Sequence, residues 1–336
     1  MSFTLRPYQQ KFCDSVVSHL ARYRRIVACA ATGSGKTKCF IYLAKRAMDK
    51  GFTVLILTEA SKIYDQLTGE LHAGNINADK KDGSILPGHI YIAMAQTLVR
   101  RPRMVQHFQQ QGQRLLIIND EAHIGTATKL LQQLITTDPL LIGFTATPDF
   151  KFAKHLLLLY KACVVGAQPD ELVNDGFLSP YRHYARVLAD FSGLQVKGGE
   201  YTEESQERVF ESKKVYDGLL KDLHTVPFKK AVVFTASIKH CEDVLNQLIA
   251  AGFSAISIHS KNTKSDFDMA MYKQPDGPNI CVSVGILTKG WDFPPVDLVI
   301  LNRATTSLPL YLQMIGRGSR TSPGKTHFTV LDYGGN

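Results

Sequence analysis

The sequence predicts an α/β fold of two lobes, each a mostly parallel sheet flanked by helices. Short apolar runs rich in β-branched residues alternate with stretches of helical periodicity, which is typical of a parallel sheet covered by helices. The same alternation returns in the second half of the chain, after a middle segment of different character. The predicted strands lie at 25–30, 53–58, 90–94, 114–119 and 140–145, and then at 229–235, 254–259, 279–284, 297–301 and 326–331.

A chain of 336 residues is long for one domain and sufficient for two. We expect a first lobe over residues 1–150, a connector over 151–225 and a second lobe over 226–336. The connector is rich in glycine near a charged run, which predicts a hairpin or loop near 190–202 followed by at least one helix over 203–222.

The composition is that of an ordinary globular protein, with 44% hydrophobic and 21% charged residues. No apolar run approaches the ~18–20 residues that span a membrane, and the first residues lack a signal-peptide pattern. The cysteines form no Cys-x-x-Cys pair, so neither zinc nor a disulfide framework is indicated and a reducing cytoplasm fits. They are Cys13, Cys29, Cys39, Cys163, Cys241 and Cys281.

The formal net charge of +9 suits a partner with a phosphate backbone. Two clusters concentrate this charge, and each is equally compatible with a solvated loop. They are Arg22, Arg24 and Arg25, and Arg100, Arg101 and Arg103.

Residues 30–37 read Ala-Ala-Thr-Gly-Ser-Gly-Lys-Thr and predict a phosphate-binding loop. They stand between a predicted strand and a predicted helix over 36–48, which is the context that such a loop requires. Glycine lets backbone N–H groups curl around an anion, and the helix N-terminus adds positive charge. Lys36 should reach the β- and γ-phosphates of a nucleotide, and Thr37 should bind Mg²⁺. The residues expected to contact the nucleotide here are Thr32, Gly33, Ser34, Gly35, Lys36 and Thr37.

Asp120 and Glu121 follow directly after the apolar run at 114–119. Ligands gather at the carboxyl ends of parallel strands, so Asp120 is expected to hold Mg²⁺ through water. Glu121 is placed to orient and deprotonate an attacking water. The alternative, a solvated strand end, is disfavoured by the apolar run that leads into the pair.

The order of these motifs resembles superfamily 2 helicases and translocases. The loop is followed by Asp-Glu-Ala-His at 120–123, Thr-Ala-Thr at 145–147 and Gln-Met-Ile-Gly-Arg-Gly-Ser-Arg at 313–320. Within that superfamily the wording is most similar to RadD-type repair proteins and phage branch-migration helicases, through Arg-Pro-Tyr-Gln at 6–9 and Gly-Trp-Asp-Phe-Pro at 290–294. The resemblance implies two RecA-like lobes with ATP in the cleft between them.

The resemblance also assigns nucleotide roles to further residues. Gln9, with Arg6 nearby, would bind the adenine edge, the alternative being an exposed residue at a helix start. Arg317 and Arg320 would face the γ-phosphate as arginine fingers, and Gln313 would sense it, the alternative being a basic helix face. Gly290 and Asp292 belong to a motif that touches both nucleotide and nucleic acid.

The remaining motifs imply coupling and nucleic-acid contact. Thr145 and Thr147 would link His123 to the nucleic-acid side, and Trp291 is expected to pack in the second lobe rather than to stack on a base. The implied nucleic-acid contacts are Thr58, Gln66, Gln96, Thr97, Arg100, Arg101, Thr235, Ser237 and Thr288.

These observations predict a DNA-stimulated ATPase that moves along or remodels branched or forked DNA, with ATP and Mg²⁺ as cofactors. An RNA helicase and a nucleotide-gated binding protein with little turnover remain the alternatives. A nuclease is disfavoured, because no second cluster of acids offers a cleavage metal. RadD-type proteins usually continue with a cysteine-rich tail, so this sequence is either shorter or a fragment.

Overall fold

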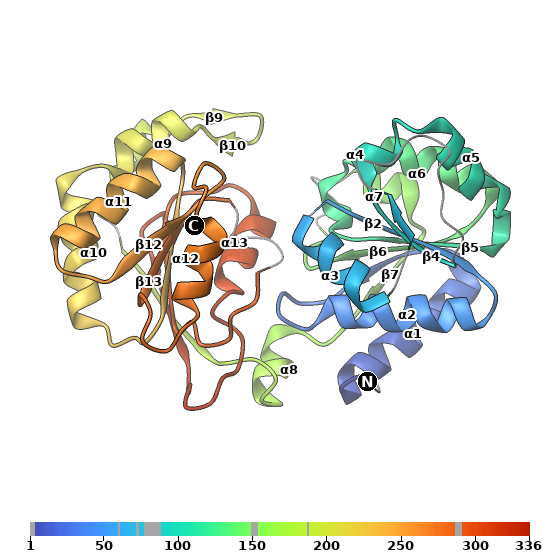
Figure 1. Ribbon diagram of the computed structural model, residues 1–336, viewed down its shortest axis with the longest axis horizontal. Coiled ribbons are helices and arrows are strands. Elements are labelled where there is room, and N and C mark those ends of the chain that lie inside the picture. Colours follow the sequence, from blue (N-terminus) through green and yellow to red (C-terminus); the bar gives the residue numbers. More distant parts are fainter. Residues whose placement is uncertain are drawn as a thin grey trace. The chain divides into compact units, whose positions relative to one another are not determined.

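The computed structural model describes residues 4–59, 61–71, 74–76, 89–148, 154–186, 188–285 and 291–336. The chain divides into two compact units, Met1–Glu171 and Leu172–Asn336, each built around one sheet (Figure 1). None of the described helices has the length and apolar character needed to cross a membrane.

The first unit contains a seven-stranded sheet in the order β3-β4-β2-β5-β6-β1-β7, and its neighbouring strands run parallel. The central strands are almost fully buried, as expected for a parallel sheet covered on both faces. The strands are β1 (Arg25–Cys29), β2 (Thr53–Thr58), β3 (Gly74–Ile76), β4 (Ile90–Met94), β5 (Leu115–Asn119), β6 (Leu140–Thr145) and β7 (Ala162–Val165).

Successive side chains of these strands point to opposite faces, and each face has its own core. Ile56 and Ile118 pack with the first core, whereas their neighbours Leu55 and Ile117 pack with the second. The helices of the first face are α1 (Pro7–Tyr23), α2 (Lys36–Asp49) and α3 (Ser61–Leu71) (Figure 1). Those of the second face are α4 (Ala95–Leu98), α5 (Pro102–Gln110), α6 (Thr128–Leu134) and α7 (His155–Leu159).

The second unit contains a six-stranded parallel sheet in the order β12-β13-β11-β14-β15-β8. Its first strand in the sequence, β8, therefore lies beside its last strand, β15. The strands are β8 (Tyr181–Ala185), β11 (Ala231–Thr235), β12 (Ala255–Ile258), β13 (Ile280–Ser283), β14 (Leu298–Asn302) and β15 (Phe328–Asp332).

Helices again cover both faces of this sheet. One face packs against α9 (Glu203–Phe210), α10 (Lys213–Thr225) and α11 (Ile238–Ala250). The other packs against α12 (Ser265–Tyr272) and α13 (Leu308–Ile315). A short hairpin of β9 (Val196–Lys197) and β10 (Glu200–Tyr201) stands beside α9 (Figure 1).

The predicted strands are confirmed, with ends that differ by at most two residues. The predicted connector differs more, because it supplies β7 to the first sheet and β8 to the second, and only α8 (Pro169–Asn174) and its flanking residues lie outside the sheets in between. The hairpin expected near 190–202 is present as β9 and β10. The helical stretch expected over 203–222, of at least one helix, is present as two helices, α9 and α10, which are separated at residues 211–212, with Ser212 as the N-cap of α10.

Candidate functional site

The phosphate loop joins the end of β1 to the start of α2. Gly33 and Gly35 have φ of 88° and 81°, a left-handed backbone that favours glycine. Gly35 is the N-cap residue of α2, so the first amides of that helix are left without intrahelical acceptors and can bind an anion. The sequence predicted this geometry, and the loop has the backbone that a phosphate requires.

Two side chains of α1 donate hydrogen bonds to the backbone of the loop. The Tyr8 hydroxyl and the Gln9 amide nitrogen each donate to the carbonyl oxygen of Ser34, both at 2.8 Å. The Gln9 amide oxygen accepts from the backbone N–H of Arg6 at 3.0 Å, and Gln9 is buried. In this structure Gln9 therefore binds the loop backbone rather than presenting its amide for an adenine. Sequence reasoning missed Tyr8, whose only signal was its place beside Gln9 at the helix start.

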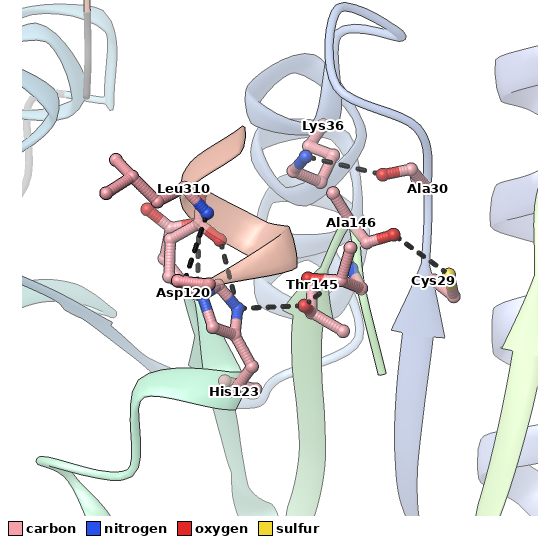
Figure 2. Close-up of polar contacts among 12 residues, drawn as sticks. Cys29, Ala30, Lys36, Asp120, His123, Thr145, Ala146 and Leu310 are labelled. Atoms are coloured by element: carbon pink, nitrogen blue, oxygen red, sulfur yellow. Dashed lines mark hydrogen bonds and ion pairs between the residues drawn. The ribbon is translucent and has the colours of Figure 1, made fainter. Parts of the chain in front are cut away.

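The side chains of the loop leave polar atoms at its centre. The Lys36 ammonium donates to the carbonyl oxygen of Ala30 at 3.3 Å (Figure 2). The Thr32 hydroxyl is buried and has no hydrogen-bond partner among the described residues, and Thr37 is half-buried. A buried hydroxyl without a partner is costly, so its presence here fits a ligand that carries acceptor atoms.

Asp120 lies immediately after β5 and is buried. One carboxylate oxygen accepts from the backbone N–H of Glu121 at 3.0 Å, and the other accepts from the Thr58 hydroxyl at 3.4 Å. Burial, and then the neighbouring charge of Glu121, raise the pKa of Asp120 to about 7, while the charge of Lys36 acts in the opposite direction. A buried carboxylate with a raised pKa, beside a second carboxylate, fits the binding of a divalent cation.

Glu121, His123 and Thr145 form a short chain of polar contacts. Glu121 has a left-handed backbone with φ of 48°, and its carboxylate lies 3.4 Å from Nδ1 of His123. The same Nδ1 lies 2.9 Å from the hydroxyl of Thr145 (Figure 2). That hydroxyl accepts from the backbone N–H of Thr147 at 3.1 Å. His123, Thr145 and Thr147, which were expected to couple hydrolysis to the nucleic acid, thus lie together after β5 and at the end of β6.

The expected nucleic-acid contacts of the first unit divide into two groups. Thr58 was expected at a strand of nucleic acid, but its hydroxyl binds Asp120 and the residue is buried. Gln96 and Arg100 are exposed at and just after α4, whereas Thr97 and Arg101 are half-buried. The Gln66 side chain lies outside the described part of the chain.

In the second unit, Gln313 is buried in α13, and the arginine segment, residues 316–320, follows it. Arg317 donates to the carbonyl oxygen of Trp291, and Arg320 forms an ion pair with Asp292 at 3.1 Å. Trp291 is buried and its indole N–H points to the sulfur of Met269 at 2.8 Å, which confirms that it packs in the second unit.

Thr235 and Ser237 are buried, and their hydroxyls have partners inside the second unit. Thr235 donates to the carbonyl oxygen of Ser283 at 3.3 Å. Ser237 caps α11 and also donates to Glu207. These two hydroxyls are therefore engaged by the protein and are not presented to a nucleic acid in this structure. Thr288 and Gly290 lie outside the described residues.

Two family models match the chain in the order of its two units. "Type III restriction enzyme, res subunit" matches residues 2–150, and "Helicase conserved C-terminal domain" matches residues 214–322. Both matched domains are those of superfamily 2 helicases. These matches agree with the helicase domains expected from the motifs.

The curated relatives of this chain are distant and longer. A "51.5 kDa protein" of a Lactococcus phage is 26% identical over 302 residues, covering 89% of this chain and 63% of the relative. "Putative ATP-dependent helicase IRC3" of Saccharomyces cerevisiae is 26% identical over 356 residues, covering 98% of this chain and 51% of the relative. The chain thus spans between about half and just under two thirds of the length of these relatives.

Solved structures share its fold. A fragment of a putative HsdR subunit of a type I restriction enzyme from Vibrio vulnificus superposes with a TM-score of 0.76 at 22% identity, over 98% of this chain and 64% of that one. The type ISP restriction-modification enzyme LlaBIII bound to DNA gives a TM-score of 0.69 at 17% identity, over 97% and 27%. These likenesses show the RecA-like fold of the two units.

Proposed function

We propose that this protein is an ATP-dependent DNA helicase or translocase that remodels branched or forked DNA. One observation carries the ATPase part of the proposal. The phosphate loop follows β1 and the carboxylate pair follows β5, and these strands flank β6 in one parallel sheet. Both motifs therefore lie at the same carboxyl edge, near enough for Lys36 to influence the ionisation of Asp120.

Each residue of this edge has a role in the proposed hydrolysis. Lys36 and the loop amides would bind the phosphates of ATP, and Thr37 with Asp120 would hold Mg²⁺. Bound Mg²⁺ supplies positive charge that offsets the charge on the phosphates. Glu121, whose carboxylate contacts His123, would orient and deprotonate the attacking water.

Residues of the second unit complete the proposed chemistry. Arg317 and Arg320 would bind the phosphoryl oxygens on which charge develops, and Gln313 would sense the γ-phosphate. The ion pair of Arg320 with Asp292 holds its guanidinium beside the motif that was expected to contact the nucleotide. His123 and Thr145 would couple changes at the nucleotide site to the nucleic-acid side.

Three observations favour DNA as the partner. The matching family description and the HsdR structure belong to restriction enzymes, and the LlaBIII structure contains DNA. The net charge of +9 suits a polyanion, and Gln96 and Arg100 are exposed where the family contacts a strand. The proposed preference for branched DNA rests on the resemblance of residues 6–9 and 290–294 to RadD-type repair proteins and phage branch-migration helicases.

The test is phosphate release from ATP over a panel of single-stranded DNA, duplex, fork, four-way junction and single-stranded RNA, at one salt concentration. We expect the greatest stimulation by fork or junction. Lys36→Ala should lower the stimulated rate by about 100-fold or more, because it removes a preorganised cation from the phosphates. Lys38→Ala, two residues along α2 and exposed, is the matched control and should keep the rate.

A second candidate is an RNA helicase. "ATP-dependent rRNA helicase RRP3" of Lodderomyces elongisporus is 23% identical over 95% of this chain, and Dbp5 bound to RNA shares the fold with a TM-score of 0.62. If only RNA stimulates phosphate release, RNA replaces DNA as the proposed partner, and the proposed ATP-driven motor remains. An active Lys36→Ala protein would reject the phosphate-loop assignment, and no phosphate release with any nucleic acid would favour a nucleotide-gated binding protein.

A further inference from the structure

The arginine segment is held to a second stretch of backbone by one lysine. The Lys325 ammonium donates to four carbonyl oxygens, and the ring of Phe328 lies 5.6 Å from the same nitrogen. Two of the four acceptors, Gly318 and Arg320, belong to the arginine segment. The other two, Pro294 and Val296, follow Asp292, which forms the ion pair with Arg320.

This arrangement depends on a positive charge. An ammonium has only three N–H donors, so four carbonyls around it share them and face one another across a single cation. Without that cation, four carbonyl dipoles would converge on a site with no donor, and their mutual repulsion would open the gap between residues 294–296 and 318–320. Arg317 and Arg320 lie on one side of this gap, and their partners, the carbonyl of Trp291 and the carboxylate of Asp292, precede the stretch on the other side.

We propose that Lys325 is a positioning residue for ATP hydrolysis, which fixes the arginine segment by binding the carbonyls of Gly318 and Arg320. The inference rests on the proposed function, in which Arg317 and Arg320 act on the γ-phosphate. It goes beyond that function because Lys325 lies outside every motif that predicted the site. A further contact supports a fixed backbone here, since the carbonyl of Arg320 also accepts from the Ser179 hydroxyl at 3.0 Å.

The charge on Lys325 is lost at an accessible pH. Burial lowers its pKa to about 8, and the charge of Asp297 opposes this effect. Among the described residues, the charged groups nearby include Lys229, whose Nζ lies 3.9 Å from the position that a Cβ at Gly324 would take. They also include the paired Arg320 and Asp292, with Arg317 on the same segment. Because the folded pKa is lowered, the ammonium is present at neutral pH and is lost as pH rises through about 8.

The experiment compares Lys325→Met with Lys261→Met, an exposed lysine of the same unit. Met keeps the apolar stem and removes the ammonium. At pH about 7 we expect kcat for ATP to fall between about 10-fold and about 100-fold, as for a small misplacement of a catalytic group. KM should stay within about threefold, because the phosphate loop is untouched. The control should match the unmodified protein, and a kcat of Lys325→Met within about twofold of it overturns the inference.

A double-mutant cycle separates positioning from general stabilisation. Arg320→Ala should lower kcat by itself, and adding Lys325→Met should lower it by no more than about threefold further, because the lysine acts through the segment that is already impaired. If the loss of kcat in the double variant equals the product of the two single losses, the inference is overturned and the proposed function stays intact. An unchanged rate for Arg320→Ala rejects the assigned role of that arginine, and with it this inference.

The pH profile of the unmodified protein tests the same point without a substitution. We expect its kcat to fall as pH rises through about 8, and Lys325→Met to lack this decline. If Lys325→Met does not fold, as judged by circular dichroism, the profile carries the test alone. A kcat that stays constant from pH about 7 to about 9.5 overturns the inference.

Discussion

The ring nitrogen Nδ1 of His123 lies 2.9 Å from the hydroxyl of Thr145, so that the residues following β5 are joined directly to the end of β6. The Thr145 hydroxyl also accepts from the backbone N–H of Thr147. The same Nδ1 of His123 also lies 3.4 Å from the carboxylate of Glu121. A shift of Glu121 during hydrolysis therefore has a path of three contacts to the backbone of Thr147, beyond β6.

Replacing Thr145 by Val should uncouple hydrolysis from nucleic acid. Val keeps the shape and removes the hydroxyl, so we expect stimulation by the best nucleic acid to fall about fivefold to tenfold, while the rate without nucleic acid is kept. The backbone N–H of Thr147 loses its acceptor, which should cost about 1–3 kcal/mol of stability. Phosphate release with and without nucleic acid, and thermal unfolding, measure the two effects.

Thr145→Ser is the matched control, because it keeps the hydroxyl and removes only a methyl group. It should retain stimulation and both hydrogen bonds. Full stimulation of Thr145→Val would exclude the contact with His123 as a coupling element.

Replacing Gly35 by Ala should damage nucleotide binding. Its φ is +81°, and a Cβ would lie 2.5 Å from the amide nitrogen of Gln9, which holds the carbonyl of Ser34. The strain and the displaced Gln9 would both distort the loop, so we expect the affinity for ATP to fall about tenfold or more. Fluorescence titration with a labelled nucleotide measures this affinity.

Gly51→Ala separates backbone strain from the loop. Gly51 has φ of +76°, and no described atom lies within 4 Å of the position of its Cβ. The substitution should cost about 1 kcal/mol of stability and leave nucleotide affinity unchanged. Equal affinities of the two alanine variants would contradict a special role for the backbone at Gly35.

The ionisation of Asp120 predicts a pH-dependent stability in the absence of Mg²⁺ and nucleotide. Its folded pKa is raised to about 7 from 3.8, so between these values the folded state binds the proton more than the unfolded state does. The contribution of Asp120 to the free energy of unfolding is therefore kept at low pH and is lost as pH rises through about 4 to about 7.

Asp120→Asn removes this ionisation and keeps partners for Thr58 and for the N–H of Glu121. We expect the variant to be more stable than the unmodified protein by about 2 kcal/mol at pH about 8, with the difference disappearing near pH about 4. Urea unfolding at the two pH values measures the difference. An equal difference in the free energy of unfolding at both pH values would show that the ionisation of Asp120 is not its cause.

Local motifs were predictable because they encode backbone conformation. Gly33 and Gly35 predict left-handed residues, and the run before Asp120 predicts a buried strand, so the loop and the carboxylate edge followed from sequence. β8 was missed because all five of its residues are exposed and it has no apolar face to reveal it. β7 was missed because it is a four-residue edge strand inside a segment that otherwise lacks strand signals.

Contacts through backbone carbonyls were beyond sequence reasoning. Lys325 binds four carbonyl oxygens, and every residue type has one, so no residue type marks the site. Thr58 was assigned to nucleic acid for a different reason: its motif was visible, but the pairing of β2 with β5 that brings it to Asp120 is a property of the sheet order.

The neighbouring positions of β8 and β15 set the order in which the second unit can be completed during synthesis. β8 leaves the ribosome before every other strand of its sheet, yet its partner among the described strands, β15, is translated after all of them. Until residues 328–332 emerge, Tyr181 and Tyr184 belong to a strand with unpaired backbone groups. The first unit, whose strands are all translated earlier, can fold during that interval, whereas the second must wait for its last strand.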